Sequence, residues 1–297
     1  MDAAIETREL SKYFHGKPAV DRLSLTVPPG SIFALLGDNG AGKTTTIRML
    51  TGLLRPDAGS ASILGLDCWQ SAVKLRSKVG YVPEKPKFYD WMTVAEIGWF
   101  TAGFYPPGFP PRYQQLTGDF ELDPKAKLQH LSKGQYAKVG LALALAGDPE
   151  VLILDEPTSG LDLLVRREFL SSMVGLAGEG RTIFISSHQV AEVERIASHV
   201  AFIAKGRLLF TASTDELRKR IIRLSLRFED QPPEPSRFGT VLERNGAGKQ
   251  WQVVLQDPSR EAVETLRSGG GIFDLEETPL SLEEVYCALL ARKEAPR

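Results

Sequence analysis

A glycine-rich segment near the start of the chain carries residue types that bind phosphate. Residues 37–44 read GDNGAGKT and match the pattern GxxxxGK followed by Ser or Thr. Glycines let backbone amides close around phosphate oxygens, lysine brings positive charge to the β and γ phosphates, and a threonine hydroxyl can coordinate Mg²⁺. A strand pattern precedes the loop and a helical pattern follows it, so a helix N-terminus also faces the phosphates. The candidate residues are Gly37, Asp38, Asn39, Gly40, Ala41, Gly42, Lys43 and Thr44.

Two adjacent acids form a second candidate for chemistry. Residues 151–156 read VLILDE, an apolar run that ends in Asp155 and Glu156. Asp155 is placed to hold the Mg²⁺ shell, and Glu156 is placed to polarise an attacking water molecule. The alternative is a buried strand that simply ends at a charged turn.

A third candidate is the run LSKGQ at residues 131–135, which precedes a helical pattern over Tyr136–Ala146. Ser132 is a natural N-cap, and free amides at this helix N-terminus can bind a γ phosphate. The alternative is an ordinary capped helix.

The inner letters of the phosphate loop occur again at residues 245–249, which read NGAGK. Here Glu243 occupies the place of the first glycine, and Gln250 replaces the hydroxyl. No helical pattern follows, so we expect a hairpin turn around Asn245–Gly246 instead of a phosphate site.

Short apolar runs alternate with helical patterns through the first two thirds of the chain, which predicts an α/β fold with a mainly parallel sheet. The expected strands are Ser31–Leu36, Ala61–Leu64, Val79–Val82, Val151–Leu154, Thr182–Ser186 and Val200–Ala204. A helical subdomain is expected at about residues 85–135. In it, Thr93–Glu96 caps one helix, the proline-rich run Pro106–Pro111 breaks that helix, and a second short helix follows at Arg112–Leu116.

The pattern changes after about residue 212, and we expect residues 215–297 to form an accessory α+β domain. Capping sequences at Ser213–Glu216 and Ser281–Glu284 open its first and last helices. The elements expected between them are strands at Ile222–Phe228, Gln250–Gln256 and Ile272–Leu275, a loop at Gln231–Pro235, and a helix at Arg260–Leu266. The last helix places Leu282, Val285, Tyr286, Leu289 and Leu290 on one face.

The composition argues against several classes of protein. The 297 residues carry 36 basic and 37 acidic side chains, which argues against binding nucleic acid through excess positive charge. The two cysteines stand apart at positions 68 and 287, so a disulfide framework is excluded. The longest strongly apolar stretch is far shorter than the roughly 20 residues that span a bilayer. The acidic, polar start MDAAIETREL lacks targeting features. We therefore expect a cytoplasmic protein.

The order of these motifs resembles the nucleotide-binding subunits of ABC (ATP-binding cassette) transporters over roughly residues 5–212. The phosphate loop, LSKGQ, VLILDEP, SGLD at residues 159–162 and His188 after TIFISS follow one another in the family's order. The stretch from residue 103 to LSKGQ is similar to cassettes of ABC-2 type exporters. The resemblance implies a P-loop NTPase (RecA-like) core with small antiparallel β and helical subdomains over residues 1–214.

The resemblance also assigns roles to residues that bind ATP and Mg²⁺. It implies that Thr45 joins the phosphate loop, that Glu156 is the general base, and that His188 contacts the γ phosphate. Thr44, Asp155 and Glu84 would serve the metal. Ser132, Gly134 and Gln135 would complete the site of a second, head-to-tail subunit, and Asp162 would lie in the loop that crosses this interface. Phe14 would stack on adenine, with Tyr13 as the alternative.

One residue departs from the family pattern. Glu84 stands where the family usually has glutamine, so we expect retained activity with altered metal affinity. The implied partners are separate transmembrane permease subunits and a second nucleotide-binding subunit, on the cytoplasmic face of the membrane. Phe88, Tyr89 and Trp91 follow Glu84, where the membrane subunit would dock or where the helical subdomain would pack.

The favoured function is that of an ATPase subunit of an exporter. One alternative is a cassette that drives a membrane partner without moving a solute. Another is a soluble ATPase that acts on ribosomes or DNA, which the single phosphate loop and the lack of sustained heptads disfavour.

Overall fold

The computed structural model describes residues 3–228, 234–268 and 272–294. The chain divides into two compact units. The first unit contains Met1–Gln189 and Ile196–Thr211, and the second contains Val190–Arg195 and Ala212–Arg297.

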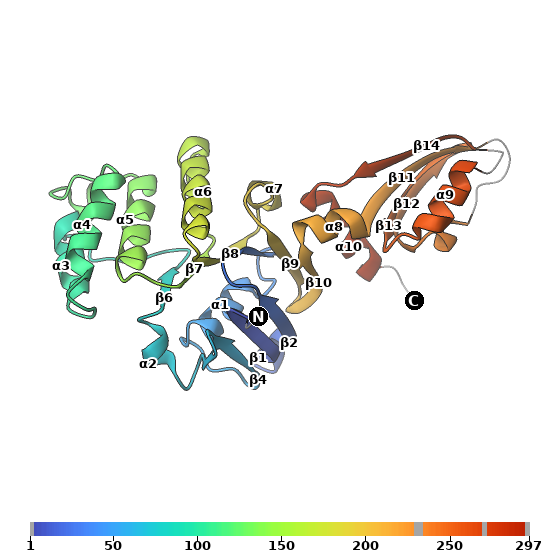
Figure 1. The fold of residues 1–297 in the computed structure, drawn as a ribbon. Helices are drawn as coiled ribbons and strands as arrows, with labels where there is room; N and C mark the ends of the chain where they lie inside the picture. The colour runs from blue at the N-terminus through green and yellow to red at the C-terminus, as the bar shows by residue number, and fades with distance from the viewer. Residues whose placement is uncertain (1–2, 229–233, 269–271, 295–297) are drawn as a thin grey trace. The chain divides into compact units, whose positions relative to one another are not determined.

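A six-stranded sheet forms the centre of the first unit, in the order β10-β9-β3-β8-β7-β6 (Figure 1). Its strands are β3 (Ile32–Leu36), β6 (Val79–Val82), β7 (Val151–Asp155), β8 (Thr182–Ser187), β9 (His199–Ala204) and β10 (Arg207–Ser213). The pairs β6–β7, β7–β8, β8–β3 and β3–β9 are parallel, as predicted. The carboxyl ends of β3, β6, β7 and β8 therefore share one edge of the sheet, which is where ligands bind in folds of this kind.

A second sheet in this unit is antiparallel, in the order β2-β1-β4-β5. Its strands are β1 (Ile5–Phe14), β2 (Lys17–Val27), β4 (Ala58–Ile63) and β5 (Leu66–Asp67). The strand expected at Ala61–Leu64 belongs here and not to the parallel sheet, because β4 pairs with β1. One core joins both sheets to helix α1 (Lys43–Leu50), whose Ile47 and Leu50 are fully buried.

Among the described residues, three helices lie between β6 and β7, and one of them differs from its predicted bounds. They are α3 (Val94–Ala102), α4 (Phe109–Asp119) and α5 (Lys133–Ala146), with a 3₁₀ turn at Leu128–His130. The Thr93 capping box is present at the start of α3. The second helix is longer than the predicted Arg112–Leu116, because Pro110 lies in the first turn, where no backbone amide is required.

The other helices of this unit are α2 (Ala72–Leu75) and α6 (Leu163–Gly178). No helix in the described parts of the chain is both long and apolar enough to cross a membrane.

The second unit contains a four-stranded antiparallel sheet in the order β12-β13-β11-β14. Its elements are α7 (Val190–Val193), α8 (Thr214–Arg220), β11 (Ile221–Phe228), a 3₁₀ turn (Pro235–Arg237), β12 (Thr240–Ala247), β13 (Gln250–Gln256), α9 (Arg260–Ser268), β14 (Ile272–Pro279) and α10 (Leu282–Glu294). Capping boxes at Ser213 and Ser281 precede α8 and α10, as predicted. Most of the loop expected at Gln231–Pro235 falls outside the described residues.

The predicted hairpin exists, but its turn was placed wrongly. Strand β12 runs through Asn245–Gly246 and ends at Ala247, which pairs with Gln250. The two turn residues are therefore Gly248 and Lys249, and Gly248 takes a positive φ of 60°.

Candidate functional site

The phosphate loop connects the buried strand β3 to helix α1, as the sequence predicted. Gly42 is the N-cap of α1 with φ 107°, a backbone conformation that favours glycine. A Cβ at Gly42 would lie 2.5 Å from the backbone oxygen of Ala19, and one at Gly37 would lie 2.3 Å from that of Ile203. The loop therefore fits between β2 and β9 only because these positions carry no side chain.

The loop lines a cavity of about 520 Å³ at the carboxyl edge of the parallel sheet. The residues that line it are Ala19, Asp38, Asn39, Gly40, Ala41, Gly42, Lys43, Thr44, Thr45, Glu84, Glu156, Ser159 and His188. Five chain segments that are separated in the sequence thus meet at one place. Ala19 and Ser159 were not among the predicted site residues, although Ser159 begins the SGLD motif.

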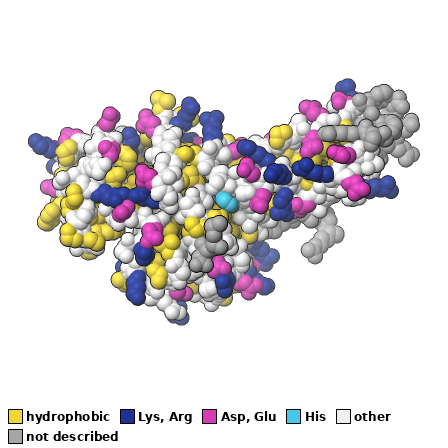
Figure 2. All heavy atoms as spheres, viewed as in Figure 1, with side chains coloured by type: hydrophobic (Ala, Val, Ile, Leu, Met, Phe, Trp, Pro, Cys, Tyr) yellow, Lys and Arg dark blue, Asp and Glu magenta, His cyan; other side chains and the backbone are white. Residues whose placement is uncertain are grey.

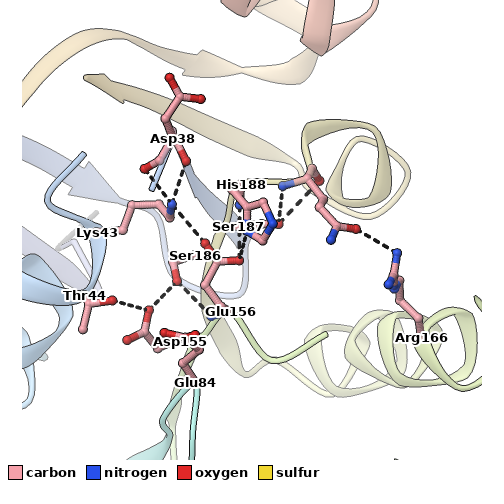
Figure 3. Close-up of polar contacts among 12 residues, drawn as sticks. Asp38, Lys43, Thr44, Glu84, Asp155, Glu156, Arg166, Ser186, Ser187 and His188 are labelled. Carbon is pink, nitrogen blue, oxygen red and sulfur yellow. Dashed lines mark hydrogen bonds and ion pairs between the residues drawn. The ribbon is translucent and has the colours of Figure 1, made fainter. Parts of the chain in front are cut away.

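Lys43 is buried, and its ammonium group contacts the start of the phosphate loop and the acid that follows β7 (Figure 3). Its Nζ donates to the backbone oxygens of Gly37 at 2.6 Å and Asp38 at 3.2 Å. It also lies 3.0 Å from Glu156 Oε1. Both side chains of this ion pair are more than nine-tenths buried, so each charge depends on the other.

Asp155 ends β7 and is 1% exposed. Its Oδ1 accepts hydrogen bonds from Ser186 Oγ at 2.7 Å and from Thr44 Oγ1 at 3.2 Å. Burial raises the pKa of Asp155 and outweighs these two hydrogen bonds, and the neighbouring carboxylates of Glu156 and Glu84 raise it further. A cation bound beside Asp155 would therefore offset the free-energy cost of its buried charge.

Ser186 links the two acids and was missed at the sequence level. Its Oγ also accepts the backbone amide of Glu156 at 3.0 Å. The available signal was the polar pair Ser186–Ser187, which follows the apolar run Ile183–Ile185 in β8.

Glu156 contacts His188 across the cavity. His188 Nδ1 lies 2.8 Å from Glu156 Oε2, and the His188 backbone amide donates to the same oxygen at 3.3 Å (Figure 3). Glu156 has φ 47°, which is uncommon for a residue with a side chain and is a form of local strain that collects at functional sites. Its carboxylate is therefore held between a lysine and a histidine.

The LSKGQ segment does not line this cavity. Ser132 caps α5: its Oγ accepts the Gln135 amide at 3.2 Å, and Gln135 Oε1 accepts the Ser132 amide at 3.0 Å. Gly134 is buried, and a Cβ there would lie 2.8 Å from Val165 Cγ1. Asp162 likewise caps α6, since its Oδ1 accepts the backbone amides of Leu164 and Val165 at 3.1 and 3.0 Å.

The proposed aromatic contacts to adenine also lie outside the residues that line the cavity. Phe14 ends β1, is 45% exposed, and has Lys12 Nζ 5.8 Å from its ring centre. Tyr13 is 42% exposed. Glu84 does line the cavity, and its Oε1 lies 3.5 Å from Lys85 Nζ.

A second, more apolar groove of about 380 Å³ lies beside the helical subdomain. Its lining includes Leu53, Tyr81, Pro86, Phe88 and Tyr105. Close to it, Tyr89 packs against the rings of Trp91 and Phe100, with centroids 6.1 and 5.6 Å apart. Figure 2 shows hydrophobic side chains gathered on the surface over α3.

Comparison with known proteins identifies the family. Residues 20–159 match the family model described as ABC transporter. The bacitracin transport ATP-binding protein BcrA of Bacillus licheniformis is 37% identical over 224 residues, which cover 74% of this chain and 73% of BcrA. The ABC transporter ATP-binding protein YtrB of Bacillus subtilis is 30% identical over 291 residues, which cover 97% of this chain and 99% of YtrB.

A solved structure agrees with this result. It is described as the ATP binding subunit of an ABC transporter, and it matches with a TM-score of 0.67 and 30% identity over 73% of this chain and 92% of that one. The predicted P-loop NTPase fold is confirmed by this match. The chain belongs to the ABC transporter ATP-binding proteins and is an ATP-binding and ATP-hydrolysing subunit of that family.

Proposed function

We propose that the cavity beside the phosphate loop holds ATP with Mg²⁺ and that Glu156 is the general base for its hydrolysis. The observation that supports this proposal is the meeting of Lys43, Thr44, Asp155, Glu156 and His188 at one edge of the sheet. These residues supply positive charge, oxygen ligands and a base, which are the parts that phosphoryl transfer to water requires.

The oxygen atoms in the cavity suit Mg²⁺. This ion takes one or two protein oxygen ligands and completes its shell with phosphate oxygens and water. Thr44 Oγ1 and Asp155 Oδ1 lie 3.2 Å apart, and Glu84 lines the same cavity. We propose that Thr44 and Asp155 hold the ion, with Glu84 beside them. When bound, it would neutralise charge on the phosphates.

The Lys43–Glu156 pair suggests how the base is prepared. A γ phosphate in the cavity competes for the Lys43 ammonium, so Glu156 is released from one of its two partners. His188 remains 2.8 Å from the other carboxylate oxygen and can hold it in place. Glu156 can then accept a proton from an attacking water molecule.

The variant Glu156→Gln tests this role. It keeps the shape of the side chain but removes the base, so we expect kcat for ATP hydrolysis to fall by about 100-fold or more while ATP still binds. Glu150→Gln is the matched control. Glu150 is an exposed acid just before β7, and its side chain forms an ion pair with Lys78. Normal hydrolysis by Glu156→Gln would refute the proposed base.

We also propose that two cassettes close around ATP. Ser132, Gly134 and Gln135 present a capped helix N-terminus outside the cavity, and such a terminus can bind phosphate from a second subunit. Asp162 caps α6, which contacts the same helix. The second subunit is either an identical chain or a related cassette.

The groove beside the helical subdomain is the proposed docking surface for a transmembrane subunit. The groove runs from the end of β6, just before Glu84, to α3. A helix of the membrane subunit bound there would therefore contact residues next to the ATP cavity. The likeness to BcrA, a bacitracin transport ATP-binding protein, supports a role as a transport subunit. We propose that this subunit is of the exporter type and works at the cytoplasmic face of the membrane. Replacing Leu53, which lines the groove and is 56% exposed, by aspartate should abolish co-purification with the membrane subunit and leave ATP binding intact. Unchanged co-purification would refute this surface.

A further inference from the structure

Arg166 connects two chain segments that leave the proposed catalytic residues. It lies in the first turn of α6, and its side chain points toward the loop of His188 (Figure 3). Arg166 Nη1 donates to Gln189 Oε1 at 2.8 Å, and Nη2 donates to the Leu161 backbone oxygen at 2.9 Å. Gln189 directly follows His188, and Leu161 lies five residues after Glu156.

The same two segments are also joined directly, because His188 Nδ1 lies 2.8 Å from Glu156 Oε2. Arg166 thus closes a ring of contacts whose other side is the Glu156–His188 pair. A guanidinium group is planar and has donors in fixed directions, so two hydrogen bonds from it set both the distance and the relative orientation of the segments. A flexible ammonium group cannot do this equally well.

The first turn of α6 also reaches the LSKGQ segment. Val165, next to Arg166, occupies the space beside Gly134, where a Cβ would approach Val165 Cγ1 to 2.8 Å. Asp162 caps this same turn. A shift of this turn would therefore move both the His188 loop and the start of α5, which would face a second subunit.

We propose that Arg166 is a positioning residue for ATP hydrolysis. It holds the loop of His188 against the segment that follows Glu156, so that the two side chains stay aligned at the cavity. It also couples this alignment to the LSKGQ segment through the first turn of α6. The inference rests on the proposed roles of Glu156 and His188.

The first test replaces Arg166 in the full chain. Arg166→Gln should lower kcat by about tenfold or more and change the Kd for ATP by less than about threefold, because the phosphate loop is untouched. Arg166→Lys keeps the charge but not the fork, so its kcat should be intermediate. Arg167→Gln is the matched control at an exposed neighbouring position and should behave as wild type. A wild-type kcat for Arg166→Gln would overturn the proposal.

The second test uses the acceptor and remains valid if Arg166→Gln fails to fold. Gln189→Ala removes the acceptor and should lower kcat in the same way, whereas Gln189→Glu keeps an acceptor oxygen and should restore it. The double variant Arg166→Gln, Gln189→Ala should lose no more than the larger single loss. Independent, multiplying losses would overturn the proposal. If Glu156→Gln is inactive while these variants hydrolyse ATP normally, only the role of Arg166 fails, whereas an active Glu156→Gln removes the proposed base itself.

Discussion

The letters NGAGK occur at residues 39–43 and again at residues 245–249, and the two copies fold differently. The first copy turns from a buried parallel strand into α1, and its lysine is 6% exposed. The second copy continues β12, turns at Gly248 and Lys249, and leaves its lysine exposed. The five residues alone therefore do not determine the local backbone structure. The strands and helices on either side determine whether the backbone amides of the segment face a ligand.

Pairing across the strands explains the second copy. Gly246 lies opposite Trp251, and a Cβ at Gly246 would lie 2.4 Å from Trp251 Cβ. Glycine is thus used there for close packing between strands. In the first copy, Gly42 is used for a close approach to the backbone of Ala19. The same residue type serves two different needs.

We expect the largest difference in ATP hydrolysis between variants of the two lysines, Lys43 and Lys249. Lys43→Ala removes the buried cation at the cavity and leaves Glu156 without its partner, so we expect ATP hydrolysis to fall by about 100-fold or more. Lys249→Ala changes an exposed turn residue and should leave kcat unchanged. Steady-state ATPase assays on both variants measure the contrast. Equal activities would mean that the first loop does not act on phosphate.

The two glycines should differ in stability. Gly42→Ala forces a Cβ to within 2.5 Å of a backbone oxygen at φ 107°, so we expect at least about 3 kcal/mol of destabilisation and loss of ATP binding. At Gly248, φ is 60° and a Cβ meets no atom within 4 Å, so Gly248→Ala should cost only about 1–2 kcal/mol. Calorimetry and nucleotide titration measure both effects. Similar melting temperatures for the two variants would contradict the difference in packing.

Folding shifts the pKa values of two carboxylates, Asp155 and Glu284, in opposite directions. Burial raises the pKa of Asp155 in the first unit. In the second unit, a hydrogen bond from the Ser281 backbone amide and the nearby Arg223 lower the pKa of Glu284. Folding therefore disfavours the ionised form of Asp155 at neutral pH and favours that of Glu284.

The signs of these shifts predict opposite changes in stability. Asp155→Asn should raise the melting temperature at pH 7 while abolishing stabilisation by ATP with Mg²⁺, because Asn keeps the acceptor oxygen without the buried charge. Glu284→Gln should lower stability slightly, by about 1 kcal/mol or less because the group is partly exposed. Its stabilising contribution is present above the ordinary glutamate pKa and disappears as the pH falls through the lowered value. Melting curves at pH 7 and about pH 3 check both signs. A destabilised Asp155→Asn would contradict the account.

The sequence was sufficient to place the phosphate loop, Asp155 and Glu156 at the carboxyl ends of strands, because strand ends and polar residues coincide there. It was not sufficient for β1, since the alternation in this strand is broken. The register of β1 shifts between Thr7 and Leu10, and Glu9 takes a positive φ of 46°. A bulge of this kind adds a residue and disrupts a period of two.

Contacts between distant segments could not be predicted either. Lys43 and Glu156 meet only because β3, β8 and β7 are neighbours in register. The bridge from Arg166 to Gln189 depends in turn on how α6 follows β7. The residue types predicted the chemistry of the site, whereas the sheet order determines which groups are paired.

Purified Glu156→Gln with ATP and Mg²⁺ tests the proposed closure and hydrolysis most directly. Size-exclusion chromatography with light scattering gives the mass of the particle, and analysis of the bound nucleotide gives its chemical state. We predict a dimer that retains ATP, because closure occurs but hydrolysis does not. A monomer that converts ATP to ADP at the wild-type rate would contradict the account.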